Sequence, residues 1–359
     1  MPARDEELIA RRLAAQQLTG PPAVTAVDVV RRLLAVQGQD ARGVRLAVRA
    51  RSAGLTAADV DQALTAERSL LITWLNRGTL HLVTAEDYGW LHALTTPPLI
   101  TSVNRRLGQE GVPPGDADRA VAVAQRALAD DGPLTRAQLR ERIAAAGVRT
   151  EGQAIVHILA LASLRGLIVR GPTAGRDHAF VLARDWLGAA APPWPRERAL
   201  AELARRYLAG HGPASDRDLA KWAGLPLRDA RRGLAAISAS LAERSDGLAE
   251  LAGAGASYGL PPPRLLGAFD PLLLGWSSRA DIVDPGGPVV TSNGLFRPFV
   301  LAGGWAAGLW NISGGTVTLS LFAPLAAADR TALDAEVADV RRFLSLAGSG
   351  QGSPAGCTG

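Results

Sequence analysis

The sequence predicts an α+β protein in which three tandem helix-turn-helix units with β-hairpin wings precede a C-terminal β-barrel-like module. Three observations support this prediction. Pairs of segments with helical spacing of apolar residues recur three times along the chain. Short apolar strands around turns follow the helix pairs. Beyond residue 263 the helical spacing gives way to alternating strands broken by glycine and proline, which is typical of a small barrel or a strongly bent sheet.

The first unit is expected over residues 1–96. Apolar residues recur at helical spacing after Thr25, and Thr56 is a good N-cap for a second helix. Two apolar stretches, 70–75 and 79–83, then flank an Asn-Arg-Gly turn. A hairpin that follows helices in this way is typical of the wing of a winged helix.

The second unit is expected over residues 97–190. Its first helix carries apolar residues on one face and stops at Gly147, and a second helix covers 153–164. Two apolar strands follow, separated by a Gly-, Pro- and Arg-containing loop at 171–177 that would be the tip of the wing.

The third unit is expected over residues 191–262, after a proline-rich linker. A helix ends at the turn Gly224-Leu-Pro226, and the recognition-type helix 227–237 carries Arg231 and Arg232. Basic residues at this position suit a helix that faces a phosphate backbone.

The remaining chain is expected to form a β-barrel-like module over 263–347. Short alternating stretches predict its strands, and a helix over 329–346 closes it. The Gly/Ser/Pro-rich tail, 348–359, is expected to be disordered.

Composition limits the function classes. The formal net charge is +5, the sequence pI is about 10.2, and Lys221 is the only lysine, so nearly every cation is an arginine. Arginine suits phosphates and guanine edges, although net charge alone favours a nucleic-acid partner only weakly. The single cysteine, Cys357, allows no disulfide within the chain, and the five histidines lack metal-ligand spacing. We therefore expect neither a metal nor another cofactor.

The same survey bears on location and assembly. The first residues are charged rather than apolar, and no apolar stretch approaches the roughly 20 residues of a membrane span. We expect a cytoplasmic, nucleoid-associated monomer that binds double-stranded DNA and no membrane.

Four motifs give the sequence a family resemblance. They are Val36-Gln-Gly-Gln-Asp40, Arg77-Gly-Thr-Leu-His-Leu-Val83, Phe269-Asp-Pro-Leu-Leu-Leu-Gly-Trp276 and Gly294-Leu-Phe-Arg-Pro-Phe299. In this order, over about residues 5–345, the chain resembles the winged-helix DNA glycosylases of the AlkZ and YcaQ type. The resemblance implies excision of alkylated bases, chiefly N7-alkylguanine, and in some members the unhooking of interstrand crosslinks.

The resemblance also assigns catalysis to Gln37 and Gln39. AlkZ-like members carry a Gln-aliphatic-Gln motif and YcaQ-like members end it in Asp; here Gly38 replaces the aliphatic residue. An N7-alkylated guanine is already cationic and leaves without a strong general acid, so a glutamine pair that positions water is plausible chemistry. Because residues i and i+2 share a face only in extended backbone, we expect the preceding helix to end near Val36. The alternative is that the glutamines only cap that helix.

Other polar residues are candidates for DNA contact. His81 alternates with leucines along the wing strand, and Arg77 and Thr79 are good phosphate ligands by type, although each also suits an ordinary turn or surface. Paired arginines elsewhere are usually solvated helix faces, so we assign function to one pair alone. The expected DNA-binding residues are Arg77, Thr79, His81, Arg231, Arg232, Arg279 and Arg297.

Two other functions would fit the same sequence. A catalytically silent winged-helix DNA-binding protein or transcription regulator shares the fold and the basic character but does not require the two glutamines. A small-molecule enzyme that uses the C-terminal module is disfavoured, because the chain has no nucleophile elbow, metal set or phosphate-binding loop.

Overall fold

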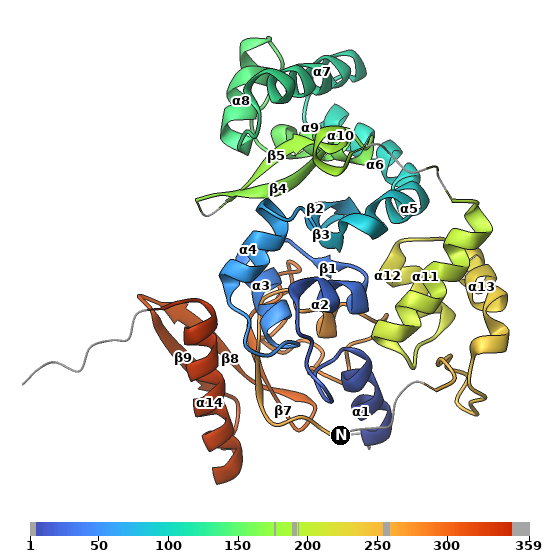
Figure 1. Cartoon of the computed structure of the whole chain (residues 1–359), viewed down its shortest axis with the longest axis vertical. Helices are drawn as coiled ribbons and strands as arrows, with labels where there is room; N and C mark the ends of the chain where they lie inside the picture. The colour runs from blue at the N-terminus through green and yellow to red at the C-terminus, as the bar shows by residue number, and fades with distance from the viewer. Residues whose placement is uncertain (1–4, 176, 189–191, 193, 254–258, 347–359) are drawn as a thin grey trace, which may run out of the picture.

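A computed structural model describes residues 5–346 except 176, 189–191, 193 and 254–258. Figure 1 shows four groups of elements in chain order. The first segment of the chain occupies the centre, the second lies above it, the third lies to the right, and the C-terminal sheet and last helix lie below and to the left (Figure 1). The expected disordered tail, 348–359, lies outside the described residues.

The first segment begins with a helix and then runs helix, short strand, two helices and hairpin. Thr25 caps the second helix and Thr56 forms a capping box with Asp59, as their positions before apolar periodicity predict. The hairpin turns at Asn76–Gly78, where Asn76 and Gly78 both have positive φ. The elements are α1 (Glu6–Ala15), α2 (Ala26–Leu33), β1 (Val36–Gln37), α3 (Ala41–Arg49), α4 (Ala57–Thr65), β2 (Leu70–Leu75), β3 (Thr79–Thr84) and α5 (Ala85–Thr95).

The second segment repeats this order helix for helix. After α6 (Pro97–Gln109) come α7 (Pro114–Asp131), α8 (Arg136–Ala145), α9 (Ala154–Leu164), β4 (Ile168–Ala174), β5 (Asp177–Leu182) and α10 (Ala183–Leu187). A single bridge between Leu134 and Phe180 takes the place of the short strand. Strand β4 pairs with β2, so the two hairpins join in one antiparallel sheet of order β1-β3-β2-β4-β5.

The third segment contains the two expected helices, a further helix before them, and a reduced wing. Its helices are α11 (Arg196–His211), α12 (Asp216–Ala223) and α13 (Leu227–Ala236). The bridges Ala214–Ala249 and Leu241–Leu251 occupy the places of the short strand and the hairpin. Polar and glycine residues fill the connection between the two bridged stretches and provide few side chains for a longer pleated ladder.

The C-terminal region forms an open sheet, which corrects the expected barrel. Strands β6 (Arg264–Leu266), β7 (Phe299–Ala302), β8 (Trp305–Ser313) and β9 (Thr316–Leu321) pair in that order, and β6 does not pair with β9. The expected strand at 288–291 contributes only a bridge between Val290 and Phe296. With so few strands, α14 (Ala327–Phe343) covers apolar surface that further strands of a barrel would bury.

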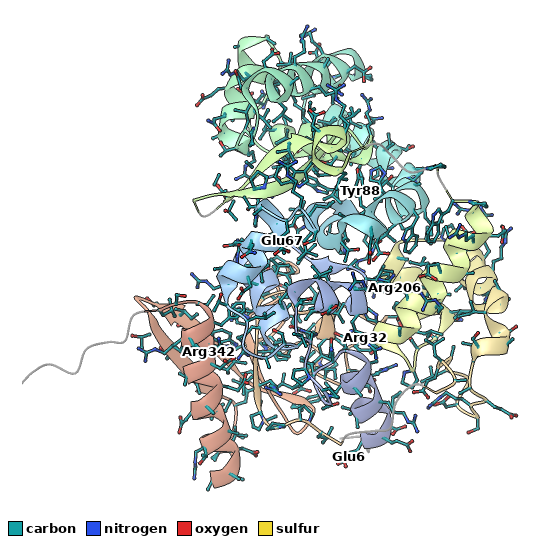
Figure 2. All side chains as sticks on the ribbon, in the orientation of Figure 1. Glu6, Arg32, Glu67, Tyr88, Arg206 and Arg342 are labelled. Atoms are coloured by element: carbon teal, nitrogen blue, oxygen red, sulfur yellow. The ribbon has the colours of Figure 1, made fainter. Side chains whose placement is uncertain are left out.

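Two hydrophobic clusters lie on the two faces of the five-stranded sheet. Ile72 and Leu82 pack into one cluster with α2–α4 and α9, whereas Leu71 and Val83 pack into the other with α5 and α11. Polar contacts fix the third segment to the first: Arg206 of α11, labelled in Figure 2, donates from both terminal nitrogens to Asp87 of α5. The sheet therefore holds the segment after β1 at the junction of three parts of the chain.

Candidate active site

The two glutamines lie where β1 ends. Helix α2 stops at Leu33, three residues before the expected end at Val36, because Leu34 adopts a positive φ and the chain then turns into β1. Gln37 pairs with His81 of β3, and the backbone N–H of Gly38 donates to the carbonyl of Leu80 at 2.7 Å. The ladder ends there, so Gln39 lies in a bend outside the strand and is exposed, whereas Gln37 is 7% exposed.

Arg77 determines how the Gln37 amide is turned. Its Nη2 donates to Oε1 of Gln37 at 3.2 Å. A guanidinium carries donors only, so the amide atom that faces it must be the carbonyl oxygen. The Gln37 Nε2 group is thereby directed away from Arg77, with its hydrogens free for another acceptor. The sequence motifs contain both residues but do not indicate this contact.

The third segment holds Arg77 from the other side. Arg77 Nη1 donates to the carbonyl of Trp222, at the end of α12, at 2.8 Å. The next turn also touches the hairpin: a Cβ at Gly224, whose φ is +69°, would lie 2.7 Å from the carbonyl oxygen of Asn76. The α12–α13 turn and the β2–β3 turn therefore fit against each other with room for glycine only.

His81 and Thr79 lie beneath this contact rather than at the surface. His81 is 2% exposed, its Nδ1 lies 2.9 Å from the carbonyl of Thr79, and burial together with the charge of Arg77 lowers its pKa to about 3. It is therefore neutral at physiological pH and supports the strand next to Gln37. The hydroxyl of Thr79 is buried without a hydrogen-bond partner. Such burial does not favour direct contact of either side chain with DNA, and that role stays a prediction.

A cavity of about 570 Å³ opens beside Gln39. Trp74 and the turn residues Arg77 and Gly78 form one side, and side chains of α6 and α9 form the other. No aspartate or glutamate lines it. Asp40, the nearest carboxylate in sequence, accepts from the backbone N–H of Gly43 and caps α3. The lining residues are Gln39, Trp74, Arg77, Gly78, Leu99, Ser102, Val103, Arg105, Arg106, Gln109, Val156, His157 and Ala160.

The charges around the cavity are cationic and mutually repulsive. Burial lowers the pKa of Arg77, and the nearby charge of Arg279 lowers it further. Burial and the charge of Arg106 likewise lower the pKa of His157, against a smaller opposing effect of Glu110. Arg77 makes no ion pair with any residue that the structure describes. An anion placed here would relieve this repulsion.

The other expected DNA-binding arginines differ in their surroundings. Arg279 is half-buried, and its guanidinium lies 5.2 Å from the centre of the Phe296 ring. Arg297 is exposed on the segment before β7. Arg231 and Arg232 are exposed on α13, but each pairs with a carboxylate, Asp216 at 2.7 Å and Glu197 respectively.

The structure also adds residues to the site that the sequence did not indicate. Arg105 and Arg106 had the appearance of an ordinary solvated helix face, yet both line the cavity beside Gln39. In the sequence, Arg105 and Arg106 are only one of several arginine pairs. Their proximity to Gln39 depends on the packing of α6 against α9, which the sequence does not indicate. By contrast, Asp270, in the motif over residues 269–276, lies in the protein interior. It accepts two hydrogen bonds from Arg51, and both side chains are fully buried.

Two kinds of feature are absent from the described part of the chain. No group of three or more His, Cys, Asp or Glu side chains is arranged to hold a metal ion there. No helix in those residues is both long enough and apolar enough to cross a membrane.

Comparison with known proteins identifies the class. The family model "DNA glycosylase AlkZ-like" matches residues 30–343. A relative named "Interstrand DNA cross-link repair glycosylase", from Streptomyces sahachiroi, is 28% identical, over 95% of this chain and 97% of the relative. The solved structure of Streptomyces sahachiroi DNA glycosylase AlkZ superposes with a TM-score of 0.75 at 25% identity, covering 96% of this chain and 97% of that chain.

These matches, together with a fold of the same kind, define a DNA glycosylase, an enzyme of DNA repair that breaks N-glycosidic bonds. Because the family match spans most of the chain, the protein belongs to the AlkZ-like DNA glycosylase family. The resemblance drawn from the four motifs is thereby confirmed.

Proposed function

We propose that this glycosylase excises N7-alkylated guanine from duplex DNA and opens interstrand crosslinks made through such adducts. Gln37 and Gln39 would position the water that attacks C1′ of the damaged nucleotide. The observation that carries the proposal is the Arg77–Gln37 hydrogen bond beside a cavity lined by Gln39 and by no carboxylate. The name of the Streptomyces sahachiroi relative supports the crosslink activity.

The chemistry suits the composition of the cavity. N7 alkylation gives the base a positive charge, which is neutralised when the base departs, so no strong general acid is required. What the enzyme must supply is a water held in line with C1′ and stabilisation of the developing oxocarbenium charge. No carboxylate is among the lining residues. The one lining histidine, His157, is unprotonated at physiological pH because burial and the charge of Arg106 lower its pKa. The absence of a strong acid would leave undamaged bases in place.

The two amides would have different tasks. Arg77 occupies one acceptor position of the Gln37 carbonyl and orients the amide, which leaves a second lone pair and two N–H donors. Gln39 is exposed at the cavity, so its carbonyl can accept from the attacking water. Phosphates of bound DNA would neutralise Arg77 and remove the repulsion between this cation and the developing sugar cation.

We further interpret the fold as three winged helices in tandem. In each segment a helix, a strand or bridge, two helices and a paired stretch follow in the same order, with the third wing reduced to bridges. The proposed boundaries are 1–96, 97–190, 191–262 and 263–347, and we propose that the protein acts as a monomer. Each unit would present surface to one duplex.

Incubation with an oligonucleotide duplex that carries one N7-methylguanine tests the function. Excision leaves an abasic site, and alkaline cleavage then yields a product of defined length. The expected result is cleavage at the modified position alone, under single-turnover conditions. If the methylated duplex and duplexes with bulkier N7 adducts all remain intact, the non-catalytic DNA-binding alternative replaces this proposal.

A further inference from the structure

Helix α6 brings two arginines to the cavity from a different part of the chain. Arg105 and Arg106 line the same cavity as Gln39 and Arg77. Both α6 arginines are exposed. Arg106 pairs with Glu110 at 2.7 Å, whereas Arg105 has no ion-pair partner among the described residues. At least one cation of this wall is therefore not neutralised within the described structure.

The same wall carries neutral hydrogen-bond donors. Ser102 and Gln109 of α6 and His157 of α9 line it as well. Because burial and Arg106 lower the pKa of His157, its ring is neutral at physiological pH and offers one N–H donor. Neutral donors beside Arg105, which has no ion pair with a described residue, suit an acceptor-rich anion such as a phosphodiester, although Glu110 already neutralises Arg106.

Helix α6 is also a firm support. It packs on α9, whose residues are mostly buried in the core, and Leu107 of α6 is 1% exposed. Side chains on such a helix are held more precisely than side chains on a mobile loop. The packed helix α6 therefore presents Arg105 and Arg106 to the cavity that Gln39 lines on another side.

We propose that α6 is the phosphate-binding wall of the active site, and that Arg105 and Arg106 contact the backbone of the damaged strand next to the nucleotide that faces Gln39. This inference rests on the proposed function for the position of that nucleotide. A sugar presented to Gln39 carries a phosphate on each side, so backbone anions necessarily enter the cavity with it. The unneutralised charge of the wall is complementary to those anions.

Salt dependence of binding to undamaged duplex tests the contact without using activity. Loss of one phosphate contact reduces the slope of log affinity against log salt by about one. We expect this decrease for Arg105→Ala, with roughly tenfold weaker binding at low salt. Arg330→Ala is the matched control, because Arg330 is exposed and has no ion pair with a described residue, and its helix α14 lies far from α6 in Figure 1. The inference is overturned if Arg105→Ala changes the slope no more than the control does.

A scan with neutral phosphates locates the contact. Single methylphosphonates are placed along each strand of a duplex that carries a stable abasic-site analogue, and affinity is measured for wild type and Arg105→Ala. One substitution, within about two nucleotides of the analogue on the same strand, should abolish the difference between the two proteins. A difference that persists at every position, or disappears only on the opposite strand, contradicts the inference. If the wild type excises nothing yet the scan succeeds, the wall stands and the proposed function fails.

Discussion

The cavity beside Gln39 and the surface of α13 are both rich in arginine, yet the two regions treat their cations differently. On α13, Arg231 and Arg232 are exposed and each has a carboxylate partner. In the cavity, Arg77 has no such partner in the described chain and its pKa is lowered by burial and by Arg279. Exposed pairs contribute little energy and cost little to separate, whereas a half-buried unpaired cation is costly unless an anion joins it.

The difference in how these arginines are neutralised indicates where a polyanion would bind most favourably. A count of arginines in the sequence favours α13, but the free energy gained from a bound phosphate depends on what already neutralises each cation. An arginine that already has a carboxylate must exchange it for the phosphate, so its net contribution to binding is reduced. Arg77 and Arg105 have no ion pair with a described residue and so gain the full interaction, whereas Arg106 must first leave Glu110; all three line the cavity beside Gln39.

Outside the two glutamines, the largest effect should follow loss of Arg77. Arg77→Ala removes both the orienting donor of Gln37 and the link to Trp222. We expect single-turnover excision to fall about 100-fold, the range for one positioning group. Arg77→Lys keeps the charge but cannot span both acceptors, so it should retain near-normal DNA affinity while remaining slow. Equal loss of rate and affinity in both variants would reduce Arg77 to a phosphate contact.

A second effect concerns pH, because burial and, less strongly, the charge of Arg77 keep His81 unprotonated in the folded protein. The pKa of His81 is about 3 in the folded protein against about 6.5 unfolded. His81 therefore binds a proton in the unfolded chain but not in the native state. As a result, the free energy of unfolding decreases as pH falls below about 6.5. At pH 5 this amounts to about 2 kcal/mol for His81 alone. Denaturant unfolding at pH 7.5 and 5 should show a smaller acid loss in His81→Gln by that amount.

A smaller effect should follow disturbance of the turn that supports Arg77. A Cβ at Gly224 would lie 2.7 Å from the Asn76 oxygen, so Gly224→Ala must shift the two turns apart. We expect excision about tenfold slower, with unchanged salt dependence of binding. Gly54→Ala is the control, because Gly54 also has positive φ (+77°) but its Cβ would meet nothing within 4 Å. Matching losses in the two variants would attribute the effect to backbone strain alone.

The smallest effect is expected on α13. Arg231→Ala and Arg232→Ala together should reduce the salt slope by less than one, because both side chains already have carboxylate partners. Each lost ion pair should cost at most about 1 kcal/mol of stability. A decrease of about two in the slope would show that both α13 arginines contact phosphates despite their carboxylate partners.

Local signals in the sequence account for much of the fold. The N-cap Thr56 and the Asn76–Gly78 turn depend on neighbouring residues, and the structure places both at the predicted kind of position. The order of helices and paired stretches follows from the same local patterns. Residue periodicity is a local property, so these elements could be predicted without knowledge of their packing.

The contacts that make the site could not be predicted in this way. The approach of Gly224 to Asn76 and of α6 to the Gln39 cavity joins segments far apart in sequence. Pairing of β2 with β4 merges two expected wings, and the absence of a β6–β9 pair leaves the expected barrel open. Which cations are neutralised also depends on long-range partners, such as Glu197 for Arg232, that no periodicity indicates.

The side-chain amides of Gln37 and Gln39 are proposed to act in base excision rather than in DNA binding. Single-turnover excision of N7-methylguanine and affinity for undamaged duplex, measured together for Gln37→Ala, Gln39→Ala and Gln39→Asp, test this role most directly. We expect each alanine variant to lose roughly 10- to 1000-fold in rate with affinity nearly unchanged, and Gln39→Asp to retain more activity than Gln39→Ala, since a carboxylate can also hold the water. Alanine variants that excise at the wild-type rate, or that lose rate only in proportion to affinity, would contradict a role of the two glutamines in the excision step.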